Sequence, residues 1–564
     1  MHIRGLGLAT MAAVLTACGG GEQKPPEQTT FHVGGSITGL SGSLTLQLNG
    51  AESLTRSANG PFSFETSVAD QSTYQVTIAT PPPEQDCTLQ GATGKVSGAD
   101  VSSVQVTCAQ RTYSLGGTVT GLNGTLQLRI EGGETLSVSA NGPFTFQTKL
   151  PKGGTYAVSV IAPPRGFRCS ITNGSGTVGG NVTDITAACT PWFDLTSFQE
   201  ATVVIGQSDF TSDLPNQGET VGPNSLDSPW GNPVFAGGKL YIPDLGSNRI
   251  LGFNGIPTQN GASANFVLGQ PDFTNTTANA GRTGLSSPES NSSDGTRLAI
   301  ADKTNNRVLL YNSLPSSTAA APDLVIGQPD FDITTGQCTA NALRVPEAVA
   351  LGAGKLVVAD TYNHRVLIWS SLPTANGAAA NLVLGQTSFT SCASNDANGD
   401  GASDTKPTAS TLFYPTDVWT DGTRLLVADN SNHRVLLWNQ FPTTNGQPAD
   451  VVLGQPDFST RAAATTQTGM NSPYNIRATG EQIFVAEDQN SRVTVWNQFP
   501  TTNGAAADVV LGQPSFTTKN RGDPSPGTLP SARSLYQPNG ILLASPQVIV
   551  TDYGNNRVLV FESH

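Results

Sequence analysis

The sequence is poor in charged residues and in methionine. Charged residues make up 13% of the 564-residue chain, and there are only 3 methionines, where an average globular protein has about 25% charged residues. This composition disfavours coiled coils and long solvent-exposed helices. The 29 Lys and Arg residues are outnumbered by 42 acidic ones, and the formal charge of -13 would repel polyphosphate. We therefore expect no nucleic-acid partner.

Histidine and the common catalytic motifs are also scarce. There are 5 histidines, one of them at position 2. The chain has no P-loop, no HExxH and no G-x-S-x-G motif, which argues against metal-dependent hydrolysis through imidazole ligands. Glycine and proline, in contrast, are abundant, with 61 and 37 copies. We therefore predict an all-β protein, and the length predicts several domains.

The first 18 residues have the features of an export signal. A single early cation, Arg4, precedes an apolar run from Leu6 to Leu15, which is too short to span a bilayer. The segment from Leu15 to Cys18 resembles the bacterial lipobox, which implies cleavage before Cys18 and lipidation of its thiol. The alternative is an ordinary cleaved signal in which Cys18 is incidental. The lipid would be the only contact with the membrane.

Residues 19–30 follow as a polar segment rich in glycine and proline, which predicts a flexible tether. In proteins with a lipobox, an aspartate directly after the cysteine favours retention in the inner membrane. This chain has Gly19 there. The resemblance therefore implies an exported, lipid-anchored protein in the outer membrane of a Gram-negative bacterium.

Six cysteines remain after Cys18, an even number that suggests disulfide bonds in an exported protein. Six cysteines allow fifteen pairings. The repeats described below favour three of these: Cys87 with Cys108, Cys169 with Cys189, and Cys338 with Cys392.

Two internal repeats occupy residues 31–110 and 111–190. The segment GGSITGL at Gly34 recurs as GGTVTGL at Gly116, and the same offset of 82 residues carries Cys87 onto Cys169. Apolar and polar residues alternate within each copy, which predicts antiparallel strands and a small β-sandwich. These repeats resemble the Ig-like or transthyretin-like spacer domains of bacterial surface proteins. We expect them to act as spacers.

A second period covers residues 198–564. The tag GQxxF occurs six times, starting with Gly206, and a second tag follows it in step: an acid, then arginine five residues later. Successive arginines are 58, 58, 69, 58 and 65 residues apart, which indicates six propeller blades. The residues of the second tag are Asp244, Arg249, Asp302, Asn305, Arg307, Asp360, Asn363, Arg365, Asp429, Asn432, Arg434, Glu487, Asn490, Arg492, Asp552, Asn555 and Arg557.

The two ends of this region predict how the ring closes. The chain enters with a lone fourth strand at 202–206 and stops after a third strand at 557–561. Pairing the two would complete the sixth blade and leave no open sheet edge. We therefore predict that Val203 to Ile205 lie beside Val558 to Val560.

The D-x-x-N-x-R-V pattern, preceded by segments such as LVVAD, resembles the NHL-repeat family of six-bladed β-propellers. The resemblance implies that the Asp, Asn and Arg are structural and tie the turn between the second and third strands to its neighbours. His364 and His433 take a position that is Asn or Ser in other copies. We interpret them as turn variants and not as metal ligands.

Loop lengths indicate one elaborated face. Between the Phe of GQxxF and the proline of the next blade there are 18, 14, 14, 25, 14 and 21 residues, whereas the distance from each arginine to the next GQ is constant. The extra length therefore falls in connections on the face that also carries the acid-to-arginine turns. Such elaboration is typical of a binding face, and tolerated surface insertions are the alternative.

The longest of these loops contains a partial calcium motif. Asp396, Asn398, Asp400 and Asp404 stand at positions 1, 3, 5 and 9 of a calcium loop. Position 12 is Pro407 and not the usual glutamate, which removes two ligand oxygens. We predict Ca²⁺ as a possible cofactor at this loop, with a solvated acidic loop as the alternative.

The leading hypothesis is a lipid-anchored binding module whose loop-rich propeller face takes an unidentified protein, peptide or glycan. One alternative is a calcium-dependent hydrolase or a lyase that works at the central channel, as in other six-bladed propellers. The first strands, however, offer few polar residues there, such as Glu347, Asp417 and Asn475, which we expect to be isolated. The other alternative is a purely structural envelope protein.

Overall fold

The computed structural model describes residues 27–522 and 529–564. Within these ranges the chain is all-β, with short 3₁₀ turns and no α-helix. No helix in the same ranges is long and apolar enough to cross a membrane. The export signal and Cys18 lie outside the described residues, so the lipid anchor stays a prediction.

The first repeat is a sandwich of two four-stranded sheets. One sheet has the order β5-β2-β10-β8 and the other β4-β3-β7-β9, and a short pair, β1 with β6, lies beside them. In β3, Leu44, Leu46 and Leu48 are buried and alternate with less buried residues, because successive side chains point to opposite faces. The strands are β1 (Thr30–Phe31), β2 (Val33–Thr38), β3 (Leu44–Leu48), β4 (Glu52–Arg56), β5 (Gly60–Ser63), β6 (Val68–Ala69), β7 (Thr73–Thr80), β8 (Gln85–Gln90), β9 (Thr93–Lys95) and β10 (Val101–Gln110).

The second repeat has the same topology. Its sheets have the orders β15-β12-β20-β18 and β14-β13-β17-β19, and β11 pairs with β16. The strands are β11 (Thr112–Tyr113), β12 (Leu115–Thr120), β13 (Leu126–Ile130), β14 (Thr135–Val138), β15 (Gly142–Thr145), β16 (Leu150–Pro151), β17 (Thr155–Ala162), β18 (Phe167–Thr172), β19 (Ser175–Thr177) and β20 (Val182–Pro191).

The prediction that all strands of the repeats are antiparallel was wrong in one place in each copy. Within one sheet of each repeat, two neighbouring strands run parallel: β2 with β10 in the first repeat and β12 with β20 in the second. Alternating apolar residues show which side of a sheet a residue takes, but they carry no information on the direction of the neighbouring strand. The direction here follows from the long connection that separates the two strands.

The predicted disulfides are confirmed. Cys87 faces Cys108 across β8 and β10, and Cys169 faces Cys189 across β18 and β20. Each of these bonds therefore links two neighbouring strands of one sheet. Cys338 bonds to Cys392 and joins two loops of the propeller.

Six four-stranded sheets form the rest of the described chain, and each is one blade. In the order of their first strands they are β22 (Val234–Ala236) to β25 (Phe266–Leu268), β26 (Pro288–Ser293) to β29 (Leu324–Ile326), β30 (Pro346–Gly352) to β33 (Leu382–Leu384), β34 (Pro415–Thr420) to β37 (Val451–Leu453), β38 (Pro473–Ala478) to β41 (Val509–Leu511), and β42 (Pro538–Ala544), β43 (Gln547–Asp552) and β44 (Arg557–Glu562) with β21 (Val203–Ile205).

The inner strands of these blades are covered on both sides. The second strands are β23 (Lys239–Asp244), β27 (Leu298–Asp302), β31 (Lys355–Asp360), β35 (Leu425–Asp429) and β39 (Ile483–Glu487), and the third strands are β24 (Arg249–Phe253), β28 (Arg307–Tyr311), β32 (Arg365–Trp369), β36 (Arg434–Trp438) and β40 (Arg492–Trp496). Nearly all their residues are buried. Packing between neighbouring blades explains why they are apolar without interruption.

The ring closes as predicted. Val203 pairs with Val560, Val204 with Leu559 and Ile205 with Val558, so β21 is the fourth strand of the blade that ends the chain. The pairing covers the edge of β44, which would otherwise be open.

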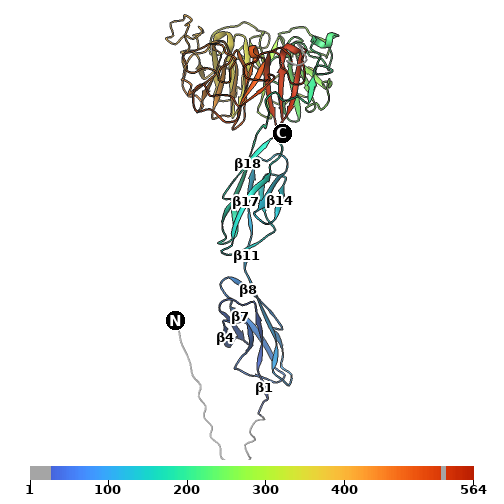
Figure 1. Cartoon of the computed structure of the whole chain (residues 1–564), viewed down its shortest axis with the longest axis vertical. Helices are drawn as coiled ribbons and strands as arrows, with labels where there is room; N and C mark the ends of the chain where they lie inside the picture. The colour runs from blue at the N-terminus through green and yellow to red at the C-terminus, as the bar shows by residue number, and fades with distance from the viewer. Residues whose placement is uncertain (1–26, 523–528) are drawn as a thin grey trace, which may run out of the picture.

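The two repeats stand in line below the propeller and form a stalk (Figure 1). The stalk meets the propeller at the turns between first and second strands of the last two blades: Ser545 Oγ donates to the Gly166 carbonyl, and Thr190 Oγ1 donates to Glu481. We call this side of the propeller the stalk-side face. Five first strands open with a proline that pairs with the acid at the end of the second strand, as in Pro346 with Asp360, so they start on the opposite side. The strand β22 pairs with β23 in the same antiparallel sense.

We call this opposite side the loop-rich face. It carries the turns between second and third strands and the described parts of the six connections that lead into first strands: residues 206–233, 269–287, 327–345, 385–414, 454–472, 512–522 and 529–537. The long connections therefore lie on the side of the propeller that faces away from the stalk (Figure 1).

Candidate functional site: the loop-rich face and the central channel

The repeat motif builds a buried ion pair in every blade. Each arginine is fully buried, and its Nε lies 2.6–3.0 Å from the motif acid. In five blades the motif asparagine donates to the same acid. Burial raises the pKa of these carboxyls, to about 6 for Asp244, although the arginine opposes the rise. The motif side chains form ion pairs and hydrogen bonds with other groups of the protein. They are therefore not available to a ligand.

The GQxxF tag completes this network, a role that sequence reasoning missed. The arginine Nη1 donates to the carbonyl of the tag's Phe, as in Arg365 with Phe389. The tag's Gln donates to the backbone of the preceding turn, as in Gln386 with the His364 carbonyl. The constant interval between each arginine and the next GQ was the available clue, because a fixed contact requires a fixed spacing.

His364 and His433 join neighbouring blades. Both close the turn after the second strand in the left-handed conformation, with φ of 52°. Their Nδ1 atoms accept the N–H of Tyr414 and Ser472, and Asn248 and Asn306 accept equivalent bonds through their side-chain oxygens. Burial, helped by Arg344, lowers the pKa of His364 to about 4, so the ring is a neutral acceptor. This geometry fits their interpretation as turn variants.

The central channel is crossed near the loop-rich face by a cluster that we call the upper layer: Glu289, Lys303, Glu347 and Tyr474. Lys303 Nζ lies 3.0 Å from Glu289 and 2.8 Å from Glu347. The Tyr474 hydroxyl lies within hydrogen-bond distance of both carboxylates, 2.8 Å from Glu347, and it can donate its proton to either one. It comes from the other side of the ring from Glu289. Trp230 stacks edge-on against Tyr474, with ring centroids 5.1 Å apart.

Burial and neighbouring charges shift the pKa values of the upper layer. Burial and the neighbouring Glu347 raise the pKa of Glu289 to about 8. Burial alone would lower the pKa of Lys303, but the two carboxylates outweigh it and raise this pKa above its ordinary value. Burial and the same carboxylates raise the pKa of Tyr474. The two carboxylates of the cluster therefore already have a cation, Lys303, between them.

A second cluster, the lower layer, closes the channel below it: Asn232, Asp417, Asn475 and Arg477. Asp417 accepts from all three partners, at 3.2 Å from Asn232, 2.8 Å from Asn475 and 2.9 Å from Arg477. The chain segments that lead into and form the first strands approach one another closely here. A Cβ on Gly231 would lie 1.8 Å from the Glu289 carbonyl oxygen, so only glycine fits.

The expectation that Glu347, Asp417 and Asn475 are isolated was therefore wrong. Glu347 belongs to the upper layer, and Asp417 and Asn475 belong to the lower one. Sequence reasoning also missed Glu289, Lys303, Tyr474 and Arg477. Their contacts join blades that lie far apart in the chain, such as the pair Tyr474 and Glu289, which are 185 residues apart, and no repeat pattern marks them.

The loop-rich face carries a group of aromatic rings that we call the aromatic patch: Tyr362, His364, Phe413 and Tyr414. The Tyr414 ring stacks on Phe413 with centroids 5.2 Å apart, and it meets Tyr362 at 5.2 Å and His364 at 4.6 Å. Tyr362 is 43% exposed, a large fraction for a tyrosine that packs against other rings. Arg461 lies over the Phe413 ring at 5.8 Å.

The predicted calcium loop has a different set of contacts. Asp396 is buried and accepts the backbone N–H groups of Gly399, Asp400 and Gly401. Asn398 donates to Asp400, and Asp404 accepts the N–H of Ala397 at 3.4 Å. Within the described residues, no three acidic, His or Cys side chains gather in a group that could hold a metal ion. Calcium binding at this loop stays a prediction, and it would require Asp396 to exchange backbone donors for a cation.

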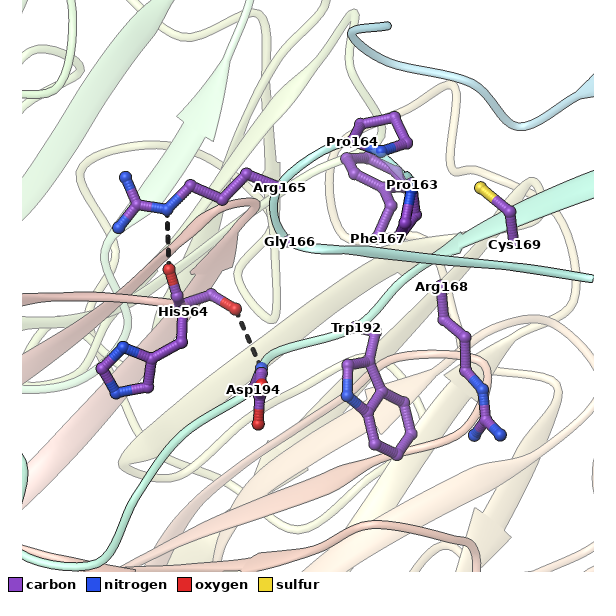
Figure 2. Close-up of a pocket in the computed structure, with 11 residues that line it drawn as sticks. Pro163, Pro164, Arg165, Gly166, Phe167, Arg168, Cys169, Trp192, Asp194 and His564 are labelled. Atoms are coloured by element: carbon purple, nitrogen blue, oxygen red, sulfur yellow. Dashed lines mark hydrogen bonds between the residues drawn. The ribbon is translucent and has the colours of Figure 1, made fainter. Parts of the chain in front are cut away.

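A cavity of about 660 Å³ lies between the second stalk module and the propeller. Arg165 Nε donates to the Ser563 carbonyl at 2.8 Å, and the Asp194 N–H donates to the Ser563 hydroxyl at the same distance (Figure 2). Arg168 lies over the Trp192 ring at 5.1 Å. These contacts fasten the stalk to the propeller, so we interpret the cavity as part of the joint.

No protein-family description matches this chain, and no curated protein matches it in sequence. Solved structures give weak likenesses. An auxiliary nutrient binding protein from Bacteroides thetaiotaomicron is 11% identical over 78% of this chain and 91% of its own, with a TM-score of 0.37. Virginiamycin B lyase from Staphylococcus aureus is 11% identical over 61% and 98%, with a TM-score of 0.29. At these scores neither likeness carries an argument about activity.

Proposed function

We propose that this protein is an exported binding protein whose loop-rich propeller face takes a protein, peptide or glycan. One observation carries the proposal: the stalk attaches to the opposite face, so all the long connections and the aromatic patch point away from it. A lipid on Cys18 would hold the other end of the stalk at the outer membrane. The disulfides and the export signal support a location outside the cytoplasm.

The aromatic patch is the centre of the proposed surface. Tyrosine and arginine are enriched among residues that contribute most to binding, because they bury large areas and keep a polar group. Tyr362 is exposed and is braced by Tyr414, so it loses little conformational freedom when a ligand covers it. Flat aromatic rings also suit the apolar face of a sugar.

Binding can be tested with the purified chain against envelope extracts and a glycan array. We expect captured partners to be lost, or bound at least about tenfold more weakly, when Tyr362 and Tyr414 are both changed to alanine. The control is Ile161→Ala, which removes an exposed apolar side chain from β17 of the second stalk module. Equal capture by the Tyr362/Tyr414 variant and the wild type would refute the proposal.

An enzyme at the central channel is the second candidate, and the convergence of Glu289 and Glu347 favours it. A calcium-dependent hydrolase or lyase would need these carboxylates for a metal or a proton. In the structure they share Lys303, and two hydrogen-bonded layers cross the channel. A Lys303→Met variant tests this reading: a calcium-dependent rise in Tm in that variant alone would show that lysine replaces the metal in this chain. Both chains carry Asp400→Ala in this test, so that the calcium loop does not contribute, and a rise with Lys303 present as well would favour the enzyme.

The calcium loop is tested separately by titrating calcium against thermal stability. A ligand that binds only the folded state raises Tm. We expect a rise in the wild type that is absent in Asp400→Ala, because Asp400 is exposed and its loss leaves the Asp396 contacts in place. An unchanged Tm in the wild type would refute the site.

A further inference from the structure

The central channel opens on the stalk-side face as a cavity of about 580 Å³, which we call the cup. All six first strands contribute to its lining. Its volume lies within the range of about 300–1,000 Å³ that small-molecule sites occupy. The cup and the aromatic patch lie on opposite faces, so a ligand here is independent of the proposed function.

Apolar and polar atoms share the wall of the cup about equally. Phe235, Leu351, Val418, Trp419 and Leu542 line it. Phe235 is 39% exposed, which is a large fraction for a phenylalanine. Two aromatic rings and three aliphatic side chains around a concave surface favour an apolar body of limited size.

The polar side chains of the lining are Asn291, Ser292, Ser293, Thr420 and Arg477. The three hydroxyls already bond to the backbone of Leu351, Arg297 and Arg424, which leaves Asn291 and Arg477 for a ligand. Arg477 belongs to the lower layer, and among the described residues it donates only through Nη1, to Asp417 and to its neighbour's carbonyl. Its remaining N–H groups are free, and its side chain is 15% exposed. It can therefore donate to a ligand without giving up Asp417.

Asn291 is fully buried, yet neither Nδ2 nor Oδ1 has a hydrogen-bond partner among the described residues. An unpaired buried amide destabilises the fold, so it calls for an explanation such as a bound ligand or water. Asn291 offers one donor and one acceptor side by side. The complementary group is another carboxamide, which accepts through its C=O and donates through its N–H.

Charge separates a carboxamide from a carboxylate. Arg477 is neutralised by Asp417 at 2.9 Å, so the polar part of the cup has no net charge. A carboxylate would bring a second negative charge close to buried Asp417, whereas an uncharged head would not. We propose that the cup binds a small uncharged molecule that has an apolar body and a carboxamide head.

The proposal is tested by isothermal titration of the full chain with phenylacetamide, and with phenylacetate as the charged counterpart of the same shape. We expect saturable binding of phenylacetamide and at least tenfold weaker binding of phenylacetate. Asn291→Leu should weaken phenylacetamide binding at least tenfold without lowering Tm, since it removes unpaired polar atoms from the interior.

A pair of variants at one position controls for the location of the site. Leu542→Trp fills the cup and should abolish binding, whereas Leu542→Ala enlarges it and should retain binding. The absence of saturable phenylacetamide binding up to its solubility limit would overturn the proposal. Unchanged binding by Leu542→Trp, or equal affinity for phenylacetate, would overturn it too.

Discussion

At the scale of single residues, the six buried arginines show how a repeated sequence becomes a repeated structure. Arg365 contacts Asp360 through Nε and donates its other N–H groups to the carbonyls of Thr339, Ala342 and Phe389. One guanidinium therefore joins the turn of its own blade to the connections before and after it. Lysine has a single ammonium and could not make these planar contacts together.

We expect Arg365→Met to destabilise the propeller by about 3–5 kcal/mol, because it leaves Asp360 buried without its partner. Chemical denaturation followed by tryptophan fluorescence measures the change. The control is Arg111→Met. Arg111 lies between the two stalk modules and forms an exposed ion pair with Asp86, so its loss should leave the propeller transition unchanged. A loss below about 1 kcal/mol for Arg365→Met would contradict the assigned role.

The upper layer makes a second prediction at this scale, on pH. The folded state holds a proton on Glu289 up to pH of about 8, whereas the ordinary pKa is 4.5. Between these values the folded chain binds more protons than the unfolded chain, so its free energy of unfolding falls as pH rises. Glu289→Gln cannot ionise and keeps a similar shape. We therefore expect Tm of the variant minus Tm of the wild type to increase from pH 5 to pH 8.

Thermal melts in buffers of matched ionic strength measure this difference. Glu65→Gln, on the exposed surface of the first stalk module, is the control and should give the same difference at both pH values. A difference for Glu289→Gln that stays constant or shrinks would show that Lys303 keeps Glu289 ionised across the range.

At the scale of strands, β21 matters more than its length of three residues suggests. It lies more than 350 residues from its partner β44 in sequence, and it completes the last blade. Without β21, the edge of β44 would be unpaired and open to other chains.

We therefore expect a fragment of residues 199–564 to melt cooperatively as a monomer, and a fragment of residues 207–564 to melt at lower temperature or to aggregate. The two fragments differ only by the segment that contains β21, so the first is the control for the second. Differential scanning calorimetry and light scattering measure the outcomes. Equal Tm and equal mass for both fragments would contradict the closure.

The strands also show where sequence reasoning succeeds and where it stops. The ring, its closure and the disulfides could be predicted because each depends on a pattern that recurs, such as the fixed place of Arg307 and Arg365 relative to GQ. The channel could not. The residue after the opening proline is Glu289 and Glu347 in two blades, but it is Thr416, Tyr474 and Asn539 in three others, so it does not recur around the ring. Only the circular arrangement brings these unlike residues together.

At the scale of the whole molecule, the joint between stalk and propeller decides how the loop-rich face is presented. Phe193 is almost fully buried and packs edge-on against Phe484 of the propeller, with ring centroids 5.6 Å apart. Its backbone N–H and C=O both bond to the Gln482 side chain, at 2.7 and 2.9 Å. These contacts join the stalk's last strand to the propeller core and hold the two bodies in one orientation.

Phe193→Ala should therefore lower the stability of the propeller by about 3–5 kcal/mol and loosen the joint at the same time. We expect small-angle scattering to show a broader distribution of molecular dimensions than the wild type, since the Gln482 bonds alone do not fill the vacated core. Phe144→Ala is the matched control, because it removes a buried phenylalanine from the second module's own core. It should destabilise that module and leave the joint intact below its melting temperature. If both variants scatter like the wild type, the orientation is held by the surface contacts of Arg165 and Ser545 and not by the buried ring.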